Sequence, residues 1–178
     1  MYRLDKLIKL DRKLYHTNDL ALAWNIANKN TLYTAIKRYV KKGVLIPVHK
    51  GLYSTTPLSQ LDLVELGKAI IHRYTYLSTE SVLVRNGIIT QNIYFTTFVC
   101  GVSKKVKIGD QNFLFRKLKD EFLFNPTGIQ NQNGVLVATT ERAVADMLYF
   151  NPKYHFDLLG NVDLDKVKQI QKEIGYLC

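Results

Sequence analysis

Polar side chains able to bond base edges and phosphate oxygens are concentrated between residues 28 and 42. Asparagine can bond adenine, lysine can bond guanine, threonine suits several base edges, and a tyrosine ring can contact a thymine methyl group. If a helix here enters a DNA groove, the residues near its start are the candidates for base contact: Asn28, Asn30, Thr31 and Thr34. The candidates for phosphate contact are Arg38, Lys41 and Lys42, and the same DNA-binding set includes Lys29, Tyr33 and Lys37.

This segment has the periodicity of an amphipathic helix. At about 100° per residue, one side of the helix carries the apolar residues Leu32, Ala35, Ile36, Tyr39 and Val40. The other side carries Asn30, Tyr33, Thr34, Lys37 and Lys41. Taken alone, an amphipathic helix with external lysines is typical of a solvated surface helix, so the neighbouring elements must decide whether it is an interface.

Two shorter helical patterns precede this helix. The apolar stripe of the first consists of Leu4, Leu7, Ile8 and Leu14. Thr17 or Asn18 can cap the second helix, because a side-chain oxygen before the first turn accepts from its free N–H groups. For the same reason Asn30 or Thr31 can cap the third, and Gly43 is expected to end it.

A β-hairpin is expected directly after the third helix. Residues 44–48 and 52–54 have the composition of short strands around a tip formed by His49, Lys50 and Gly51. Three helices followed by a small hairpin predict a winged helix-turn-helix domain over residues 1–58. In such a domain, His49 and Lys50 would contact phosphates or the minor groove, and the third helix would enter the major groove.

The distribution of charge agrees with this interpretation. The 178-residue chain has a net charge of +10 from 25 basic and 15 acidic residues. Eleven of the basic residues but only Asp5, Asp11 and Asp19 lie within residues 1–58, so the remaining 120 residues are close to neutral. An excess of cations confined to one module points to a polyanionic partner for that module.

The rest of the chain, residues 59–178, predicts a mixed α/β domain. Helical patterns cover residues 61–72, 79–86 and 164–174, and a further helix capped by Thr139 or Thr140 carries the apolar residues Ala143, Val144, Met147 and Leu148. Strand patterns cover residues 92–102, 104–115 around a Gly109–Asp110 turn, and 135–138. The expected fold class is therefore α+β, with a small and mainly antiparallel sheet in the second domain.

Residues that could perform catalysis do not form recognisable motifs. His16, His49, His72 and His155 lack the spacing of a zinc site, and the glycines form no phosphate-binding loop. Cys100 lies in an apolar segment typical of a buried thiol, and the acidic pairs Asp62–Glu65 and Asp120–Glu121 suit solvated surfaces. We expect no enzyme activity, no metal and no cofactor.

The N-terminal segment is not typical of a secretion signal. Arg3, Lys6, Lys9 and Arg12 interrupt its apolar residues, and no apolar run in the chain approaches the roughly 18 residues that a membrane helix needs. We therefore expect a cytoplasmic location and no membrane partner.

Three stretches of the sequence resemble the AbiEi family of type IV antitoxins and related winged-helix regulators. The first runs from Gly43 through Lys50, Gly51, Leu52 and Tyr53, the second comprises residues 76–83 and Gly87, and the third comprises residues 138–143 and Asp146. The resemblance implies an N-terminal winged helix, repression at inverted repeats in the protein's own promoter, and counteraction of a nucleotidyltransferase-type toxin without a stable complex. Arg142 and Asp146, one helical turn apart, are expected to form a local ion pair.

Two alternatives stay open at this point. The near-neutral residues 59–178 could form a protein-interaction module, or the chain could be a stand-alone regulator without antitoxin activity. A nucleic-acid-processing enzyme using acidic residues of the second domain is a third interpretation. Retardation of the chain's own upstream DNA separates a DNA-binding regulator from a protein-interaction module, and metal-dependent nuclease activity would favour the enzyme.

Overall fold

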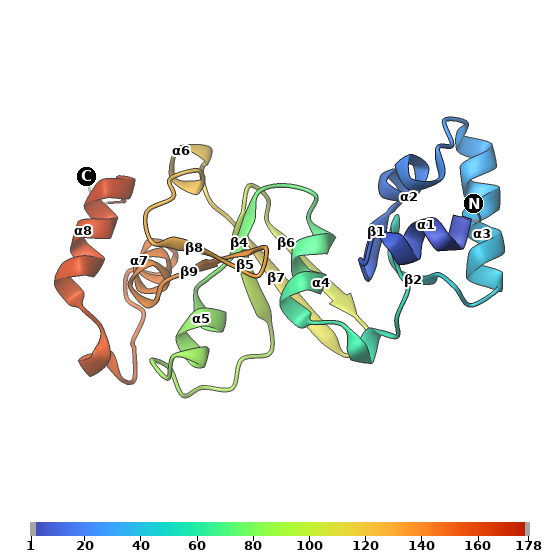
Figure 1. Cartoon of the computed structure of the whole chain (residues 1–178). Helices are drawn as coiled ribbons and strands as arrows, with labels where there is room; N and C mark the ends of the chain where they lie inside the picture. Colours follow the sequence, from blue (N-terminus) through green and yellow to red (C-terminus); the bar gives the residue numbers. More distant parts are fainter. Residues whose placement is uncertain (1–2, 177–178) are drawn as a thin grey trace. The chain divides into compact units, whose positions relative to one another are not determined.

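The computed structural model describes residues 3–176 and divides into two compact units, one ending at Asp62 and the other beginning at Leu63 (Figure 1). Each unit has its own helices and its own β-sheet. The chain is therefore an α+β protein, as its sequence predicts.

The first unit contains three α-helices and a small antiparallel sheet of three strands, in the order β1-β3-β2. Its elements are α1 (Arg3–Lys9), β1 (Leu14–His16), α2 (Thr17–Trp24), α3 (Lys29–Lys41), β2 (Ile46–His49), β3 (Leu52–Ser54) and a 3-10 helix, η1 (Leu58–Gln60). In this sheet Tyr15 of β1 pairs with Tyr53 of β3, and Ile46 of β2 pairs with Ser54 of β3.

Strand β1 corrects the expectation that Leu14 continues the apolar stripe of the first helix. Helix α1 ends at Lys9, and Asp11 adopts a φ of +46°, which a helix cannot contain. Leu14 instead pairs with Ser54. The buried Tyr15 beside it donates its hydroxyl to the Leu7 carbonyl at 2.9 Å and so ties the strand to α1. Leu4 belongs to α1, but its side chain is outside the described part of the chain.

The core of the first unit is built from all three helices and the segment after α3. Its buried members are Leu7, Tyr15, Leu20, Trp24, Leu32, Ala35, Ile36 and Leu45. The rings of Trp24 and Tyr39 lie 5.2 Å apart, so α2 and α3 pack directly against each other. This core fixes the orientation of α3.

Helix α2 begins at Thr17, so its cap precedes both expected caps, Thr17 and Asn18. His16 occupies the N-cap position, and its backbone N–H donates to Asp19 Oδ2 at 2.7 Å. Asn25 ends the helix in the left-handed conformation with φ +53°, as asparagine does more readily than most residues. The chain then turns into α3 within a few residues.

The second unit contains a six-stranded sheet in the order β6-β7-β5-β4-β9-β8. Its strands are β4 (Thr75–Leu77), β5 (Thr96–Cys100), β6 (Lys104–Ile108), β7 (Gln111–Lys117), β8 (Ile129–Gln132) and β9 (Val135–Ala138). Its helices are α4 (Leu63–Ile70), α5 (Glu80–Arg85), α6 (Asp120–Leu123), α7 (Thr140–Phe150), the 3-10 helix η2 (Leu159–Asn161) and α8 (Leu164–Ile174).

The sheet of the second unit is mixed. Three pairs are antiparallel, namely β6 with β7, β5 with β4, and β9 with β8, whereas β7 with β5 and β4 with β9 are parallel. The pairs β6–β7 and β8–β9 are local hairpins, whereas the parallel pairs join strands that are not consecutive: β6 lies between β5 and β7, and β5 to β8 lie between β4 and β9. Three of the five strand pairs are therefore antiparallel, in agreement with the expected mainly antiparallel sheet, whereas the two parallel pairs were not expected.

Helices cover both faces of this sheet. Gly67 of α4 lies against the rings of Phe98 and Phe113, so α4 covers the face on which those rings lie. Arg116 points to the opposite face because side chains alternate along a strand. There its guanidinium lies over the ring of Phe150 in α7 and pairs with Glu80 in α5. Helices α5 and α7 therefore cover the second face.

Candidate nucleic-acid interface

Helix α3 is capped by Asn28. The sequence predicts Asn30 or Thr31 as the cap, and this prediction is wrong. Asn28 has an extended backbone conformation, and its Oδ1 accepts from the Thr31 N–H at 3.0 Å and from the Thr31 hydroxyl at 3.3 Å. The helix therefore starts two or three residues earlier than the sequence suggests. Asn28 Oδ1 and the Thr31 hydroxyl are therefore engaged in this cap.

The opposite end of α3 agrees with its sequence. Lys42 is the C-cap residue, and Gly43 follows with a φ of +70°. A left-handed residue at this position favours glycine because it has no Cβ.

The two predicted faces of α3 are separated in the structure. Leu32, Ala35 and Ile36 are buried, and Tyr39 and Val40 are half-buried against the core of the first unit. The exposed residues are Lys29, Asn30, Thr31, Tyr33, Thr34, Lys37, Arg38, Lys41 and Lys42, and Asn28 before them is also exposed. All ten candidates from this segment therefore lie on one accessible surface, which we call the α3 face.

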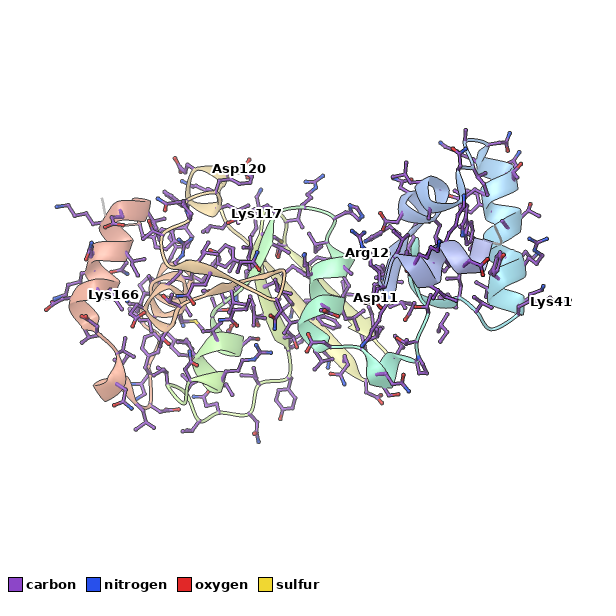
Figure 2. The ribbon with its side chains drawn as sticks, viewed as in Figure 1. Asp11, Arg12, Lys41, Lys117, Asp120 and Lys166 are labelled. Carbon is purple, nitrogen blue, oxygen red and sulfur yellow. The ribbon has the colours of Figure 1, made fainter. Side chains whose placement is uncertain are left out.

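The α3 face has a strong and uncompensated positive charge. Among the described residues, none of Lys37, Lys41 and Lys42 forms an ion pair, and the Lys41 side chain points away from the body of the helix (Figure 2). The guanidinium carbon of Arg38 lies 5.6 Å from the centre of the Tyr39 ring, and the residue is exposed. Such cations attract phosphates.

An open depression lies along the first half of the α3 face. It has a volume of about 340 Å³ and is lined by Asn30, Thr31, Thr34, Ala35 and Arg38. Its wall contains a hydrogen bond in which the Thr34 hydroxyl donates to the Asn30 carbonyl at 2.8 Å. The hollow is polar and shallow, a shape suited to a flat polar edge and not to an enclosed ligand.

The hairpin of β2 and β3 carries the remaining two candidates. His49 is the half-buried last residue of β2 and pairs with Leu52, and the exposed Lys50 lies in the turn. Gly51 follows with a φ of +72°. Its carbonyl accepts from the Thr17 N–H at 2.9 Å, which ties the tip of the hairpin to the start of α2. Lys50 is therefore presented from a fixed turn of the same unit as α3.

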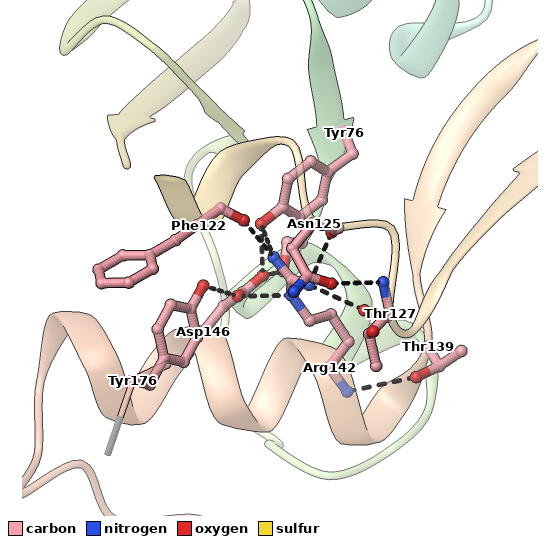
Figure 3. Close-up of polar contacts among 9 residues, drawn as sticks. Tyr76, Phe122, Asn125, Thr127, Thr139, Arg142, Asp146 and Tyr176 are labelled. Atoms are coloured by element: carbon pink, nitrogen blue, oxygen red, sulfur yellow. Dashed lines mark hydrogen bonds and ion pairs between the residues drawn. The ribbon is translucent and has the colours of Figure 1, made fainter. Parts of the chain in front are cut away.

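The second unit contains a buried polar network around Arg142 and Asp146, which do form the expected ion pair (Figure 3). Arg142 Nε donates to Asp146 Oδ1 at 2.9 Å, and neither side chain is exposed. Asp146 also accepts from the hydroxyls of Tyr76, Ser78 and Tyr176, at 3.1, 2.7 and 2.6 Å. The other guanidinium nitrogens of Arg142 donate to the Tyr76 hydroxyl and to the carbonyls of Phe122, Asn125 and Thr127.

This network ties strands and helices of the second unit together, and its ion pair is fully buried. Burial, and next to it the charge of Asp146, raise the pKa of Tyr76 and Tyr176, so both phenols stay protonated. Each carboxylate oxygen accepts two hydrogen bonds and no polar atom of the ion pair is left open. The spacing of Arg142 and Asp146 reveals the pair, but only the fold brings the two tyrosines and Ser78 to it.

The other chemistry considered in the sequence is nucleophilic attack by Cys100 and metal binding. Cys100 is buried, its Sγ–H donates to the Val102 carbonyl, and burial raises the pKa of the thiol, which opposes nucleophilic attack. Within residues 3–176, no three histidine, cysteine or acidic side chains lie close enough together to hold a metal ion. None of the helices in the same part of the chain is both long and apolar enough to span a bilayer.

Comparison with known proteins gives a likeness in fold. No protein-family model matches the chain, and no curated protein matches its sequence. Among solved structures, the chain is similar to the crystal structure of the RV2827C protein from Mycobacterium tuberculosis, with a TM-score of 0.58 over 95% of this chain and 69% of that chain. The two sequences are 9% identical, so the likeness concerns the architecture alone.

Proposed function

We propose that the chain is a sequence-specific DNA-binding regulator of transcription, with its first unit acting as a winged helix-turn-helix. Helix α3 enters the major groove with the α3 face toward the bases, and the hairpin of β2 and β3 forms the wing. The observation that carries this proposal is the separation of α3 into a buried apolar face and an exposed face whose lysines form no ion pair with any acidic residue that the structure describes.

The geometry of the first unit supports this assignment. Helices α2 and α3 pack through Trp24 and Tyr39, and the adjoining hairpin is fixed to α2 through Gly51 and Thr17. A rigid body that presents a helix and a neighbouring turn can contact a groove and the phosphates on its flank at the same time. Lys50 in the turn supplies a cation for the second contact.

The expected target is the promoter of the protein's own gene, read at inverted repeats by two copies of the chain. This part of the proposal, together with a role as antitoxin of a nucleotidyltransferase-type toxin in the cytoplasm, depends on the resemblance to the AbiEi family. The α3 face supports DNA binding independently of that resemblance. A stand-alone regulator would have the same first unit and no effect on a toxin.

The DNA-binding proposal is tested by charge reversal on the α3 face. We expect Lys37→Glu with Arg38→Glu to abolish retardation of the duplex upstream of the chain's own gene, because the change replaces two phosphate-binding cations with two anions. The matched control is Lys166→Glu with Lys168→Glu on α8 of the second unit, which should bind like the wild type. Circular dichroism and Trp24 fluorescence check that both variants fold. Equal binding by both variants would exclude the α3 face as the interface.

The antitoxin role requires a separate experiment. We expect co-expression of the chain to restore growth of cells that express a nucleotidyltransferase encoded beside its gene. Rescue by the Lys37→Glu, Arg38→Glu variant would assign the antitoxin activity to a surface other than the α3 face. Absence of rescue, with DNA binding intact, would leave a plain regulator.

A further inference from the structure

The hydrogen bonds of α3 divide its polar residues into those that hold the helix and those that are free to meet a ligand. Asn28 Oδ1 already accepts two hydrogen bonds from Thr31, and the Thr34 hydroxyl donates to the Asn30 carbonyl. Recognition of adenine by an amide requires both its oxygen, which accepts from N6, and its nitrogen, which donates to N7. Asn28 could offer both groups only by giving up the cap.

The side chain of Asn30, unlike that of Asn28, has no part in the cap. It is exposed, and within the described chain its side-chain amide takes part in no hydrogen bond, although its backbone carbonyl accepts from Thr34. It is the second residue of α3, in the first turn, where side chains of an inserted helix reach base edges. Asn30 also lines the open depression on the α3 face.

The position of Asn30 on the helix strengthens the assignment. At about 100° per residue, the residues farthest from the buried face of α3 are Asn30, Thr34, Lys37 and Lys41. Of these four, Thr34 already donates its hydroxyl hydrogen to the Asn30 carbonyl. The two lysines can donate hydrogen bonds but have no acceptor atom. Asn30 is the member of this line that offers a planar donor and acceptor together.

We propose that Asn30 is the specificity-determining residue of the α3 face and that it reads an adenine in the major groove through a bidentate amide contact. This inference depends on the proposed function, since it requires α3 to enter the groove. Asn28 and Thr31, both candidates for base contact from the sequence, act as positioning residues that fix the first turn and thereby the direction of Asn30.

The first test is selection of bound sequences from a pool of duplexes with a randomised 20-base-pair segment. The wild type should enrich an adenine at one position of each half-site, and Asn30→Ala should bind with that position relaxed and the other positions unchanged. Asn18→Ala is the matched control, because Asn18 is also an exposed asparagine in the second position of its helix. The control should keep the adenine.

The second test probes the two hydrogen bonds directly on the selected duplex. Replacing the selected adenine by 7-deazaadenine removes the N7 acceptor and keeps the N6 donor, so one of the two hydrogen bonds is lost, and a single hydrogen bond contributes roughly 2- to 13-fold in affinity. We expect the wild type to bind the 7-deazaadenine duplex more weakly than the adenine duplex by a factor in this range. Asn30→Ala should bind the two duplexes with equal affinity. Asn30→Asp retains the shape and suits the helix start, but it cannot donate to N7, so it should also be insensitive to the analogue.

The outcomes separate the two proposals. If the wild type enriches no sequence and binds no duplex, the proposed function fails and this inference fails with it. If the wild type enriches a sequence but Asn30→Ala and Asn30→Asp enrich the same adenine and respond to 7-deazaadenine like the wild type, DNA binding stands and the assignment to Asn30 is overturned.

Discussion

Arg142 and Asp146 meet inside helix α7, with Nε 2.9 Å from Oδ1 and no exposed surface on either side chain. The pair connects distant parts of the second unit, because Tyr76 comes from β4, Tyr176 follows α8, and the carbonyls of Asn125 and Thr127 precede β8. A single arginine thus donates to three carbonyls of half-buried residues, Phe122, Asn125 and Thr127. Apolar side chains at positions 142 and 146 could fill the same space, but they could not form these hydrogen bonds.

We expect Asp146→Asn to lower the free energy of unfolding by about 3–5 kcal/mol, because it leaves the Arg142 charge buried without a counter-ion. Urea denaturation followed by circular dichroism measures the change. Asp165→Asn is the control, since Asp165 forms an exposed pair with Lys168 at 3.8 Å and such pairs contribute about 0–1 kcal/mol. Equal stability of the two variants would contradict a structural role for the buried pair.

We expect the second unit to lose stability at alkaline pH through Tyr76 and Tyr176. Burial and the Asp146 carboxylate raise the pKa of both phenols in the folded chain, while in the unfolded chain they ionise near pH 10. Above that pH the folded state binds more protons than the unfolded state, so stability falls by about 1.4 kcal/mol per pH unit for each such tyrosine. Unfolding by urea at several pH values should show a shallower fall for Tyr176→Phe than for the wild type; an identical slope would exclude Tyr176 as a contributor.

The elements of this second unit differ in how far the sequence predicts them. Helix α8 spans Leu164–Ile174 as expected, and α7 is capped by Thr139, whose side chain accepts from the Arg142 N–H. Strands β4 and β8 were not expected, because each has only three or four residues and their order in the sheet depends on pairing with distant segments. Thr75–Leu77 is buried along its whole length and so lacks the alternation that marks a half-exposed strand.

Gly67→Ala should destabilise the second unit by about 1–3 kcal/mol, although alanine favours a helix more than glycine does. A Cβ at this position of α4 would lie 2.5 Å from Cζ of Phe98 and 3.2 Å from Cδ1 of Phe113, and both rings are fully buried. The helix would have to move away from the sheet. Gly160→Ala, where a Cβ would have no neighbour within 4 Å, serves as the control, and equal thermal stability of the two variants would contradict this close packing.

Asn28→Ala should lower the stability of the first unit by about 1 kcal/mol, because the Thr31 N–H loses its acceptor. Trp24 is the only tryptophan of the chain and lies buried in the core of this unit, so its fluorescence during denaturation reports on the unit by itself. Asn28→Asp keeps an acceptor and should resemble the wild type. Stability loss by both variants alike would contradict the cap.

For helix α3, the sequence predicts which residues are exposed but not which residue caps the helix. The periodicity of residues 29–41 predicts which residues are exposed, since a helix repeats its faces regularly. It does not predict that the cap is Asn28, because Asn28, Asn30 and Thr31 are all good capping residues. The choice depends on where the chain leaves α2, and the left-handed turn at Asn25 fixes that point.

The affinity for DNA should depend steeply on salt if the α3 face and the hairpin meet phosphates. The exposed cations available for this contact are Lys29, Lys37, Arg38, Lys41, Lys42 and Lys50, and we expect about five of them to neutralise a phosphate. Each neutralised phosphate contributes about 0.9 to the slope of log affinity against log salt concentration, so the slope should be about −4 to −5. Fluorescence anisotropy of a labelled duplex over a range of potassium chloride concentrations measures this slope.

Removing a single one of these cations tests whether the phosphates are contacted one by one. Lys37→Ala should reduce the magnitude of the slope by about 1 and weaken all sequences to a similar degree, because phosphate contacts carry no sequence information. Lys168→Ala on α8 changes the net charge by the same amount and should leave the slope unaltered, since α8 belongs to the other unit. If both variants reduced the slope equally, the salt dependence would come from the net charge of the chain and not from contacts made by the α3 face.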